Sequence, residues 1–390
     1  MDRRRFIKGI CSTAALTALT VRANSKFPAR INGNERLLYI GTYTNGTPSK
    51  GIYVYRFNTI DGDLSYLSTV ENVVDPSFLA TDRSGRFLYV VNETLEYEGK
   101  KSGALSSFAI DKRNGALTLL NKTASLGGAP CDIVVTNDGR NVIVANYVGG
   151  NLAVFLVDRN GKLGSNSDLE QHTGTGPNKE RQEAAHAHSI VLDKNNVFAA
   201  SCDLGSDKIY IYKLDHKTGH LTPNPAQEFY RSHPGAGPRH LVFHQTLDLA
   251  FVINELDCTV TSLKFDPVHG TLAEIQTVST LPKDWSGANT CAEIQISPDG
   301  RFVYGSNRGH DSIVAYKIDQ LSGKLTLVGH TSSGGQVPRN FIIDPSGKFL
   351  LAANQKSNNI VVFAVDQKTG KIEPNGKVID VPAPVCLDLV

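Results

Sequence analysis

Apolar and polar positions alternate along this chain in short runs, and one pattern of runs recurs seven times. In each copy an alternating stretch ends in Asp or Asn, a short turn follows, and Gly-x-Leu or Gly-x-Ile opens the next stretch. The seven copies span residues 58–64, 111–117, 158–163, 215–221, 266–272, 319–325 and 366–372. Period-two alternation rich in β-branched and aromatic residues is typical of half-buried strands. The pattern therefore predicts strands joined by tight turns.

A second pattern interleaves with the first and consists of Asp-Gly or Ser-Gly between two apolar runs. It is found at 82–90, 137–144, 297–304 and 344–350. Glycine supplies the positive φ that hairpin turns require, so each of these segments predicts a hairpin. The repeat glycines are 46 to 58 residues apart, close to the roughly 40 to 50 residues of a four-stranded propeller blade. We therefore expect an all-β fold, a seven-bladed β-propeller of four-stranded antiparallel blades.

The copies also predict how the ring closes. An innermost strand is expected to begin near each of seven short loops, at Pro76, Pro130, Ala187, Pro238, Cys291, Pro338 and Pro384. The first copy, which starts near Arg36, lacks such a strand, so the C-terminal strand should pair with the N-terminal strands and complete that blade. A ring closed in this way leaves no exposed sheet edge. A sandwich or a two-domain β-protein would not account for seven full copies.

The first 23 residues read as an export signal. Arg3-Arg4-Arg5 is followed by Phe6 and Lys8, then by a short apolar stretch and a small-residue cleavage site at Ala23. Paired arginines in this setting indicate the twin-arginine export machinery, and the apolar stretch is too short to span a bilayer. We expect a signal at 1–23, a linker at 24–35 and the propeller domain at 36–390. The expected location is periplasmic or secreted, without stable membrane insertion after cleavage; a leader retained in the cytoplasm is the alternative.

Composition and charge narrow the classes of partner. The chain has 40 basic and 38 acidic residues, a formal net charge of +2, and no basic run beyond the first residues. This balance gives no indication of a nucleic-acid partner. Five scattered cysteines follow the signal, an odd number without the spacing of a disulfide framework or a zinc site. We expect buried thiols, no cofactor, and a monomer or weak dimer.

Charged residues concentrate where the inner strands begin and where the second strands end. The scaffold needs apolar side chains at inner positions, so ionisable groups there suggest a functional pocket. The inner-strand starts carry His188, Arg239, His240, Glu293, Arg339 and Asn340, and the second-strand ends carry Glu255, Asn307 and Arg308. Because inner strands begin on one face of a propeller, we expect these side chains to share one mouth of the central channel.

Five segments carry a resemblance to a known family. They are His186-Ala187-His188, Gly237-Pro238-Arg239-His240, Asn254-Glu255-Leu256, the run 306–311 and the run 338–341. Together they resemble the seven-bladed lactonase family, which includes bacterial 6-phosphogluconolactonases and fungal carboxy-muconate cyclases. The resemblance covers the chain from Leu37 onwards. It implies a catalytic set of His188, Arg239, Glu255 and Arg308.

The chemistry of these residue types suits lactone hydrolysis. His188 or Glu255 would accept a proton from the attacking water, and Arg239 and Arg308 would hold an anionic substrate group and the developing oxyanion. The expected substrate-binding residues are His186, His240, Glu293, Asn307, Arg339 and Asn340. The leading hypothesis is a carboxylic-ester hydrolase that opens a sugar-derived or similar anionic lactone. A muconate-type cycloisomerase and a non-catalytic binding or scaffold propeller are the alternatives.

Each candidate also has a purely structural interpretation. Arg239 and Arg308 can form ion pairs across blades with Glu255 or Glu293, and His186 and His188 can hydrogen-bond a buried loop. His-x-His on a strand places both imidazoles on one side, as in metal sites. We expect no metal here, because no third ligand accompanies the pair and the arginines would repel a cation. The remaining histidines expected at the surface are His172, His216, His220, His269 and His330.

Overall fold

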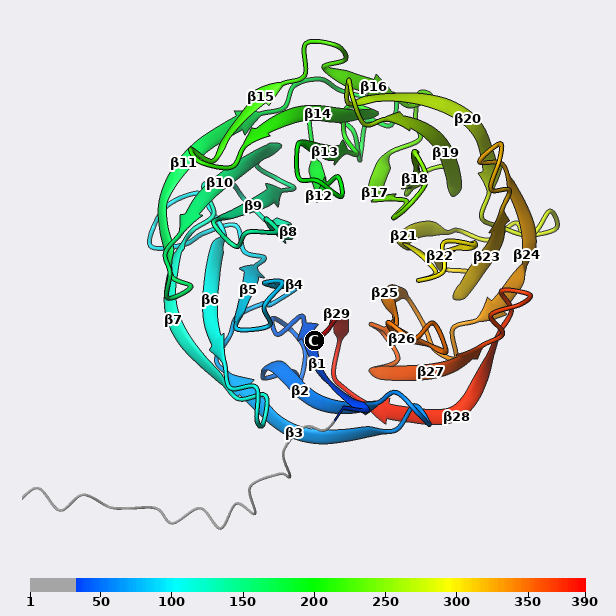
Figure 1. The fold of residues 1–390 in the computed structure, drawn as a ribbon, viewed down its shortest axis with the longest axis horizontal. Coiled ribbons are helices and arrows are strands. Elements are labelled where there is room, and N and C mark those ends of the chain that lie inside the picture. The colour runs from blue at the N-terminus through cyan, green and yellow to red at the C-terminus, as the bar shows by residue number, and fades with distance from the viewer. Residues whose placement is uncertain (1–32) are drawn as a thin grey trace, which may run out of the picture.

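The structure is a computed structural model, and it describes residues 33–390. Within that range it contains 29 strands and no helix, arranged as seven antiparallel sheets around a central axis (Figure 1). Six sheets have four strands, and the sheet of β12–β15 has a fifth, β16, beside β14. The seven-bladed propeller predicted from the repeat is therefore confirmed.

The blades follow one another in chain order. From the inner to the outer strand, blade 1 contains β29 (Pro384–Leu389), β1 (Glu35–Thr42), β2 (Gly51–Asn58) and β3 (Leu64–Glu71); blade 2 contains β4 (Phe78–Thr81), β5 (Phe87–Asn92), β6 (Ala104–Ile110) and β7 (Leu117–Ala124); and blade 3 contains β8 (Pro130–Val135), β9 (Asn141–Asn146), β10 (Asn151–Val157) and β11 (Leu163–Gln171). Blade 4 contains β12 (Ala187–Leu192), β13 (Phe198–Asp203), β14 (Lys208–Asp215), β15 (His220–Pro223) and β16 (Phe229–Arg231), and blade 5 contains β17 (Pro238–Phe243), β18 (Leu249–Asn254), β19 (Thr259–Asp266) and β20 (Thr271–Ser279). Blade 6 contains β21 (Thr290–Ile296), β22 (Phe302–Arg308), β23 (Ser312–Ile318) and β24 (Leu325–Ser332), and blade 7 contains β25 (Pro338–Ile343), β26 (Phe349–Asn354), β27 (Asn359–Val365) and β28 (Ile372–Asp380).

The ring closes between the two ends of the described chain. Strand β29 pairs antiparallel with β1, with Leu38 opposite Leu389 and Gly41 opposite Cys386. Figure 1 shows this C-terminal strand, in dark red, on the inner side of the blue N-terminal strands. The predicted completion of the first blade by residues 384–390 is confirmed. The signal and the first part of the linker, residues 1–32, lie outside the described residues.

The repeat glycine marks a contact between neighbouring blades. Each of the seven follows an outer turn with positive φ, from 68° at Gly270 to 82° at Gly161. A Cβ added at Gly270 would lie 2.3 Å from the Phe198 ring, and one at Gly161 would lie 2.2 Å from the Phe87 ring. Phe198 and Phe87 each open the second strand of the preceding blade. Glycine therefore recurs because a positive φ and close packing against the preceding blade are both needed.

The core is also distributed between blades. Seven buried apolar clusters are present, and each draws its residues from two neighbouring blades. The cluster across the closure joins Leu38 and Phe57 of the first blade to Phe349 and Val362 of the last. Burial of apolar surface at about 25 cal/mol per Å² therefore holds the ring together at every junction, including the closure.

The strand directions define two faces of the hub. All inner strands begin on one side, here called the start face, and finish on the other, the end face. Antiparallel pairing brings the last residue of each second strand back to the start face, as in Pro238 opposite Asn254 and Pro338 opposite Asn354. The predicted grouping of inner-strand starts with second-strand ends is therefore confirmed.

Candidate active site

The centre of the start face is a buried carboxylate, Glu255, directly after β18. Its Oε1 lies 2.7 Å from Nη2 of Arg181, and its Oε2 lies 3.0 Å from Nε of Arg239 and 2.9 Å from Nη2 of Arg308. Three guanidinium groups from three separate segments therefore share one carboxylate. The Glu255 side chain is only 5% exposed, so these ion pairs are shielded from water.

Two of these arginines also donate hydrogen bonds to backbone carbonyls. Nη1 of Arg239 donates to the carbonyl of Ala292 at 2.7 Å, and Nη2 of Arg308 donates to the carbonyl of Cys291 at 2.6 Å. Both carbonyls belong to β21, which is the inner strand of the next blade for Arg239 and the neighbouring strand of the same blade for Arg308. The ion pair that was the structural alternative for these arginines is present, and Glu255 is its partner.

The electrostatics keep this carboxylate charged. Burial alone would raise the pKa of Glu255, but Arg308, Arg239 and Arg181 outweigh it and hold the pKa at about 2. Burial and the nearby Arg308 and Arg339 lower the pKa of Arg239 to about 10. At neutral pH Glu255 is therefore an anion and a weak base.

Arg181 is a member of the site that the sequence patterns did not identify. It lies on the loop between β11 and β12, and its Nη2 also donates to the Tyr147 hydroxyl at 3.3 Å. The neighbouring Gln182 anchors this loop, since its buried amide donates to the Leu204 carbonyl at 2.9 Å and to Asp207 at 2.7 Å. The one available signal was length, because this copy has the largest spacing between repeat glycines, from Gly161 to Gly219.

The two histidines of the His-x-His segment differ in their surroundings. Both ring nitrogens of His186 are engaged, with the Tyr147 carbonyl at 3.0 Å and Glu183 at 3.0 Å, and the ring stacks on Tyr147. By contrast, Nε2 of His188 lies 3.9 Å from Oε2 of Glu255, and its Nδ1 lies 3.9 Å from the Cys131 sulfur. His186 therefore holds its loop in place through both ring nitrogens. By contrast, Nε2 of His188 has no hydrogen bond and lies beside the arginine cluster.

The environment of His188 favours its neutral form. Burial, with Arg239, His240 and Arg339 close by, holds the pKa of His188 well below its ordinary value. A neutral imidazole can accept a proton, whereas an imidazolium cannot. Three guanidinium groups already occupy the Glu255 oxygens, whereas Nε2 of His188 has no hydrogen-bond partner among the described residues, so the contacts leave His188 the freer proton acceptor.

Arg339 brings a fourth guanidinium to the start face. It lies over the Tyr43 ring, 5.3 Å from the ring centre, and Tyr43 in turn donates to Glu93 at 2.9 Å. Within residues 33–390, the Arg339 side chain makes neither an ion pair nor a hydrogen bond to another side chain or carbonyl. Its donors are therefore available to a ligand.

Four further predicted site residues lie elsewhere. The Asn307 amide is fully buried and donates to the Thr280 carbonyl at 2.9 Å, so it fixes a loop. Asn340 donates to Glu293 at 2.6 Å and accepts from the Leu387 backbone at 2.9 Å, which ties three inner strands together. His240 and Glu293 form a pair one position further along the inner strands, and they line a cavity that faces the end face.

One surface expectation was wrong. His172 is buried, its Nδ1 lies 2.9 Å from Asp203, and its ring stacks on Tyr210 at 3.9 Å. His172 follows directly after the outer strand β11, a position that we expected to be exposed. Its contacts with Asp203 and Tyr210 of the next blade bury it instead.

Neither a metal cluster nor a membrane span is found in the described part of the chain. No group of three or more His, Cys, Asp or Glu side chains in residues 33–390 is placed to hold a metal ion. No helix long and apolar enough to cross a bilayer occurs there either. The five cysteines in this range are buried and form no disulfide with one another.

The protein is therefore a seven-bladed propeller whose hub gathers a histidine, a buried carboxylate and four arginines at the start face. Comparison with known proteins identifies the family. Residues 37–389 match the family model described as lactonase, seven-bladed beta-propeller, and the chain belongs to this family. Membership confirms the prediction of a lactone-hydrolysing enzyme in the carboxylic-ester hydrolase class.

Individual relatives agree with this assignment. The chain is 38% identical over 304 residues to the 6-phosphogluconolactonase of Bacillus subtilis, covering 78% of this chain and 84% of that protein. It is 37% identical over 306 residues to the 6-phosphogluconolactonase of Formosa agariphila, covering 78% and 85%. The solved structure of the periplasmic gluconolactonase of Pseudomonas aeruginosa superposes with a TM-score of 0.84 and 32% identity, covering 91% of this chain and 99% of that one.

Proposed function

We propose that this protein hydrolyses a sugar-derived, anionic lactone, in the manner of a 6-phosphogluconolactonase, at the Glu255 cluster on the start face. The observation that carries the proposal is the convergence of Arg181, Arg239 and Arg308 on Glu255 beside a buried, neutral His188. The names of the relatives support the reaction class.

His188 is the proposed general base. Hydrolysis requires that a water molecule lose a proton as it attacks the lactone carbonyl, and Nε2 of His188 has no short hydrogen bond to satisfy it. The imidazolium formed by that transfer would lie 3.9 Å from the Glu255 carboxylate, which stabilises it electrostatically. The ring-opening oxygen then takes the proton back from His188, so the histidine ends as it began.

Arg239 and Arg308 are the proposed oxyanion donors. Glu255 and the carbonyls of β21 hold both guanidinium groups in place before substrate arrives. Preorganised donors lose no orientation energy as negative charge develops on the carbonyl oxygen, and removal of one such donor costs about 10² to 10³ in rate. Glu255 is then a positioning residue, because it acts through Arg239 and Arg308.

Arg181 and Arg339 are proposed to hold the anionic group of the substrate. Arg339 has free donors over Tyr43, and the Arg181 side chain is 37% exposed. A phosphate or carboxylate could accept paired hydrogen bonds from either.

The proposed location is the periplasm or outside the cell. Support comes from the export signal expected at 1–23 and from the periplasmic gluconolactonase of P. aeruginosa, a structural neighbour. An anionic lactone other than a cytoplasmic sugar phosphate would then be the substrate that meets the enzyme. Mass spectrometry of the protein in cell fractions tests this, and an intact residue 1 in the cytosolic fraction would overturn it.

A panel of lactones tests the proposed function. Acid release is followed with a pH indicator for 6-phosphoglucono-δ-lactone, glucono-δ-lactone and galactono-γ-lactone, each corrected for spontaneous hydrolysis. We expect enzyme-dependent acid release with at least one of them, and its loss in His188→Asn. Acid release at the spontaneous rate with every lactone would overturn the hydrolase proposal, and a change in the ultraviolet spectrum of a carboxy-muconate would favour the cycloisomerase.

A further inference from the structure

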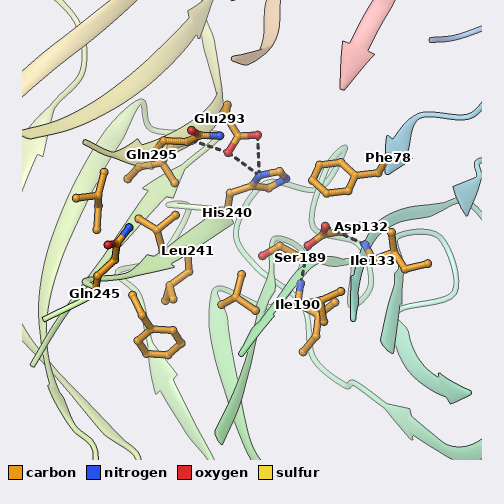
Figure 2. Close-up of a pocket in the computed structure, with 16 residues that line it drawn as sticks. Phe78, Asp132, Ile133, Ser189, Ile190, His240, Leu241, Gln245, Glu293 and Gln295 are labelled. Atoms are coloured by element: carbon orange, nitrogen blue, oxygen red, sulfur yellow. Dashed lines mark hydrogen bonds and ion pairs between the residues drawn. The ribbon is translucent and has the colours of Figure 1, made fainter. Parts of the chain in front are cut away.

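The hub contains a cavity on the end face, away from Glu255. Its volume is about 370 Å³, and its walls come from four consecutive inner strands, β8, β12, β17 and β21, together with Phe78 of β4. Figure 2 shows its lining residues converging from these strands. A volume of this size accommodates a small organic molecule.

This cavity is distinct from the proposed active site. Its lining comes from the later positions of the inner strands, such as Val134, Val191 and Val242, and none of the arginines that pair with Glu255 takes part. The two sites approach each other at one place, where the His188 and His240 rings lie 5.3 Å apart.

The His240 ring, in the wall of the cavity, carries a hydrogen-bond acceptor that is covered and has no partner. Nδ1 of His240 lies 3.4 Å from Glu293, and a carboxylate beside it places the ring proton on that nitrogen. Nε2 therefore carries a lone pair, and it has no hydrogen-bond partner among the described residues although the residue is only 7% exposed. Figure 2 shows this side of the ring directed between Phe78 and Asp132. A buried acceptor of this kind favours a ligand that donates a hydrogen bond.

Asp132 stands beside His240 and is held rigidly. Its two carboxyl oxygens accept the backbone N–H groups of Ile133 at 2.9 Å and Ile190 at 2.7 Å, which joins β8 to β12. Burial raises the pKa of Asp132 to about 8, so this carboxyl is mostly an uncharged acid at neutral pH.

The charges around the cavity select against ionic ligands. No lysine or arginine is among the residues that line it, so an anion would find no counter-charge. Glu293 is a carboxylate in the lining, but His240 and Asn340 already engage it, so a cation would find no free counter-charge either. Most of the wall is aliphatic, including Ile133, Leu241 and Ile294.

We propose that the end-face cavity is a second ligand site, which binds an uncharged molecule with an apolar body and a hydroxyl group that donates to Nε2 of His240. The apolar body would lie along the aliphatic walls, with Phe78 beside the hydroxyl group. The site goes beyond the hydrolysis of a lactone and does not depend on it.

Four matched six-membered-ring probes test the site: cyclohexanol, methoxycyclohexane, the cyclohexylammonium ion and cyclohexanecarboxylate. Binding to the full chain is measured by saturation-transfer NMR and calorimetry. We expect cyclohexanol to bind about tenfold or more tightly than the ether, since the ether leaves the buried acceptor unpaired, and both ions to bind more weakly still. Equal affinity for alcohol and ether, tighter binding of either ion, or no binding of any probe would overturn the proposal.

Two variants localise the binding. Val191→Trp fills the cavity and should abolish cyclohexanol binding, whereas Val378→Trp on the outer strand β28, where Val378 is exposed, is the matched control. His240→Phe keeps the ring but removes Nε2, and it should erase the preference for alcohol over ether. Melting temperatures establish that each variant is folded. Unchanged cyclohexanol binding in folded Val191→Trp, or a preserved preference in His240→Phe, would place the probe elsewhere and overturn the assignment.

Discussion

Two buried carboxyl groups in the hub, Glu255 and Asp132, behave in opposite ways. Both are almost completely shielded from water, yet the pKa of Glu255 is held at about 2 and that of Asp132 rises to about 8. Burial disfavours the charged form in each case. Glu255 stays ionised because three guanidinium groups contact it, whereas Asp132 receives only two backbone N–H groups and the weak influence of Arg239.

The comparison shows how one scaffold supports two kinds of environment. Strands β12, β17 and β25 carry histidine or arginine near their first positions and aliphatic residues at their later ones. The start face is therefore charged, and the end face is largely apolar with a few polar groups. Predictions that change one carboxyl and not the other test this division.

The largest effect is expected from Glu255→Gln. The amide preserves shape but leaves three guanidinium groups without their shared anion, which should cost about 3 to 5 kcal/mol in the free energy of unfolding. Hydrolysis should fall by about 10³ or more, since the oxyanion donors lose their fixed positions. Urea unfolding and lactone assays measure the two effects.

Asp132→Asn is the matched control for that variant. The amide keeps one acceptor but places an NH2 donor opposite the other backbone N–H, of Ile133 or Ile190, so it should cost about 1 to 3 kcal/mol in the free energy of unfolding and leave hydrolysis nearly intact. Comparable losses in the two variants would contradict the contrast between these carboxyls.

The next largest effect should separate the two histidines beside Glu255. His188→Asn removes the proposed base and should lower kcat by about 10² to 10⁴ with the fold retained. His186→Asn should instead lower the melting temperature, because His186 bridges Tyr147 and Glu183, and should leave kcat within about tenfold. Reversed effects on kcat would transfer the role to His186.

A third prediction concerns pH. Because the folded pKa of Glu255 is depressed, its contribution to stability is complete above its unfolded value and is lost as pH falls from about 4.5 to about 2. Asp132 has a raised folded pKa, so its contribution is complete below about pH 4 and is lost as pH rises towards 8. Urea unfolding from about pH 2 to pH 9 should show a loss of stability below about pH 4.5 that is reduced in Glu255→Gln, and a loss between about pH 4 and pH 8 that is reduced in Asp132→Asn.

The smallest effect is expected from Arg181→Met. Loss of one partly exposed guanidinium should raise KM for an anionic lactone by about tenfold while a neutral lactone is little affected. Lys179→Met, an exposed cation on the same loop, is the control. An equal rise in KM for charged and neutral lactones would show that Arg181 positions Glu255 and does not hold the substrate.

The sequence predicted most residues of the candidate site, but it did not predict which contacts each of them makes. Glu255, Arg239, Arg308 and His188 were expected at one mouth because strand direction places inner-strand starts and second-strand ends together. Arg181 was missed because it lies on a loop, 74 residues from Glu255, whose path depends on the buried contacts of Gln182. The separation of His240 and Glu293 from the Glu255 cluster was missed because neighbouring positions of one strand point to different parts of the hub.

The sequence by itself determined the number of blades, their strand order and the closure of the ring. These follow from local causes, namely the alternation of apolar residues and the turn glycines, which act within a few residues and repeat seven times. Only the tertiary structure decided that three arginines share Glu255 and that His188 is left free while His186 is engaged. It also decided that a cavity opens behind His240. Those outcomes depend on distances between blades and on the path of one long loop, and no local pattern encodes either.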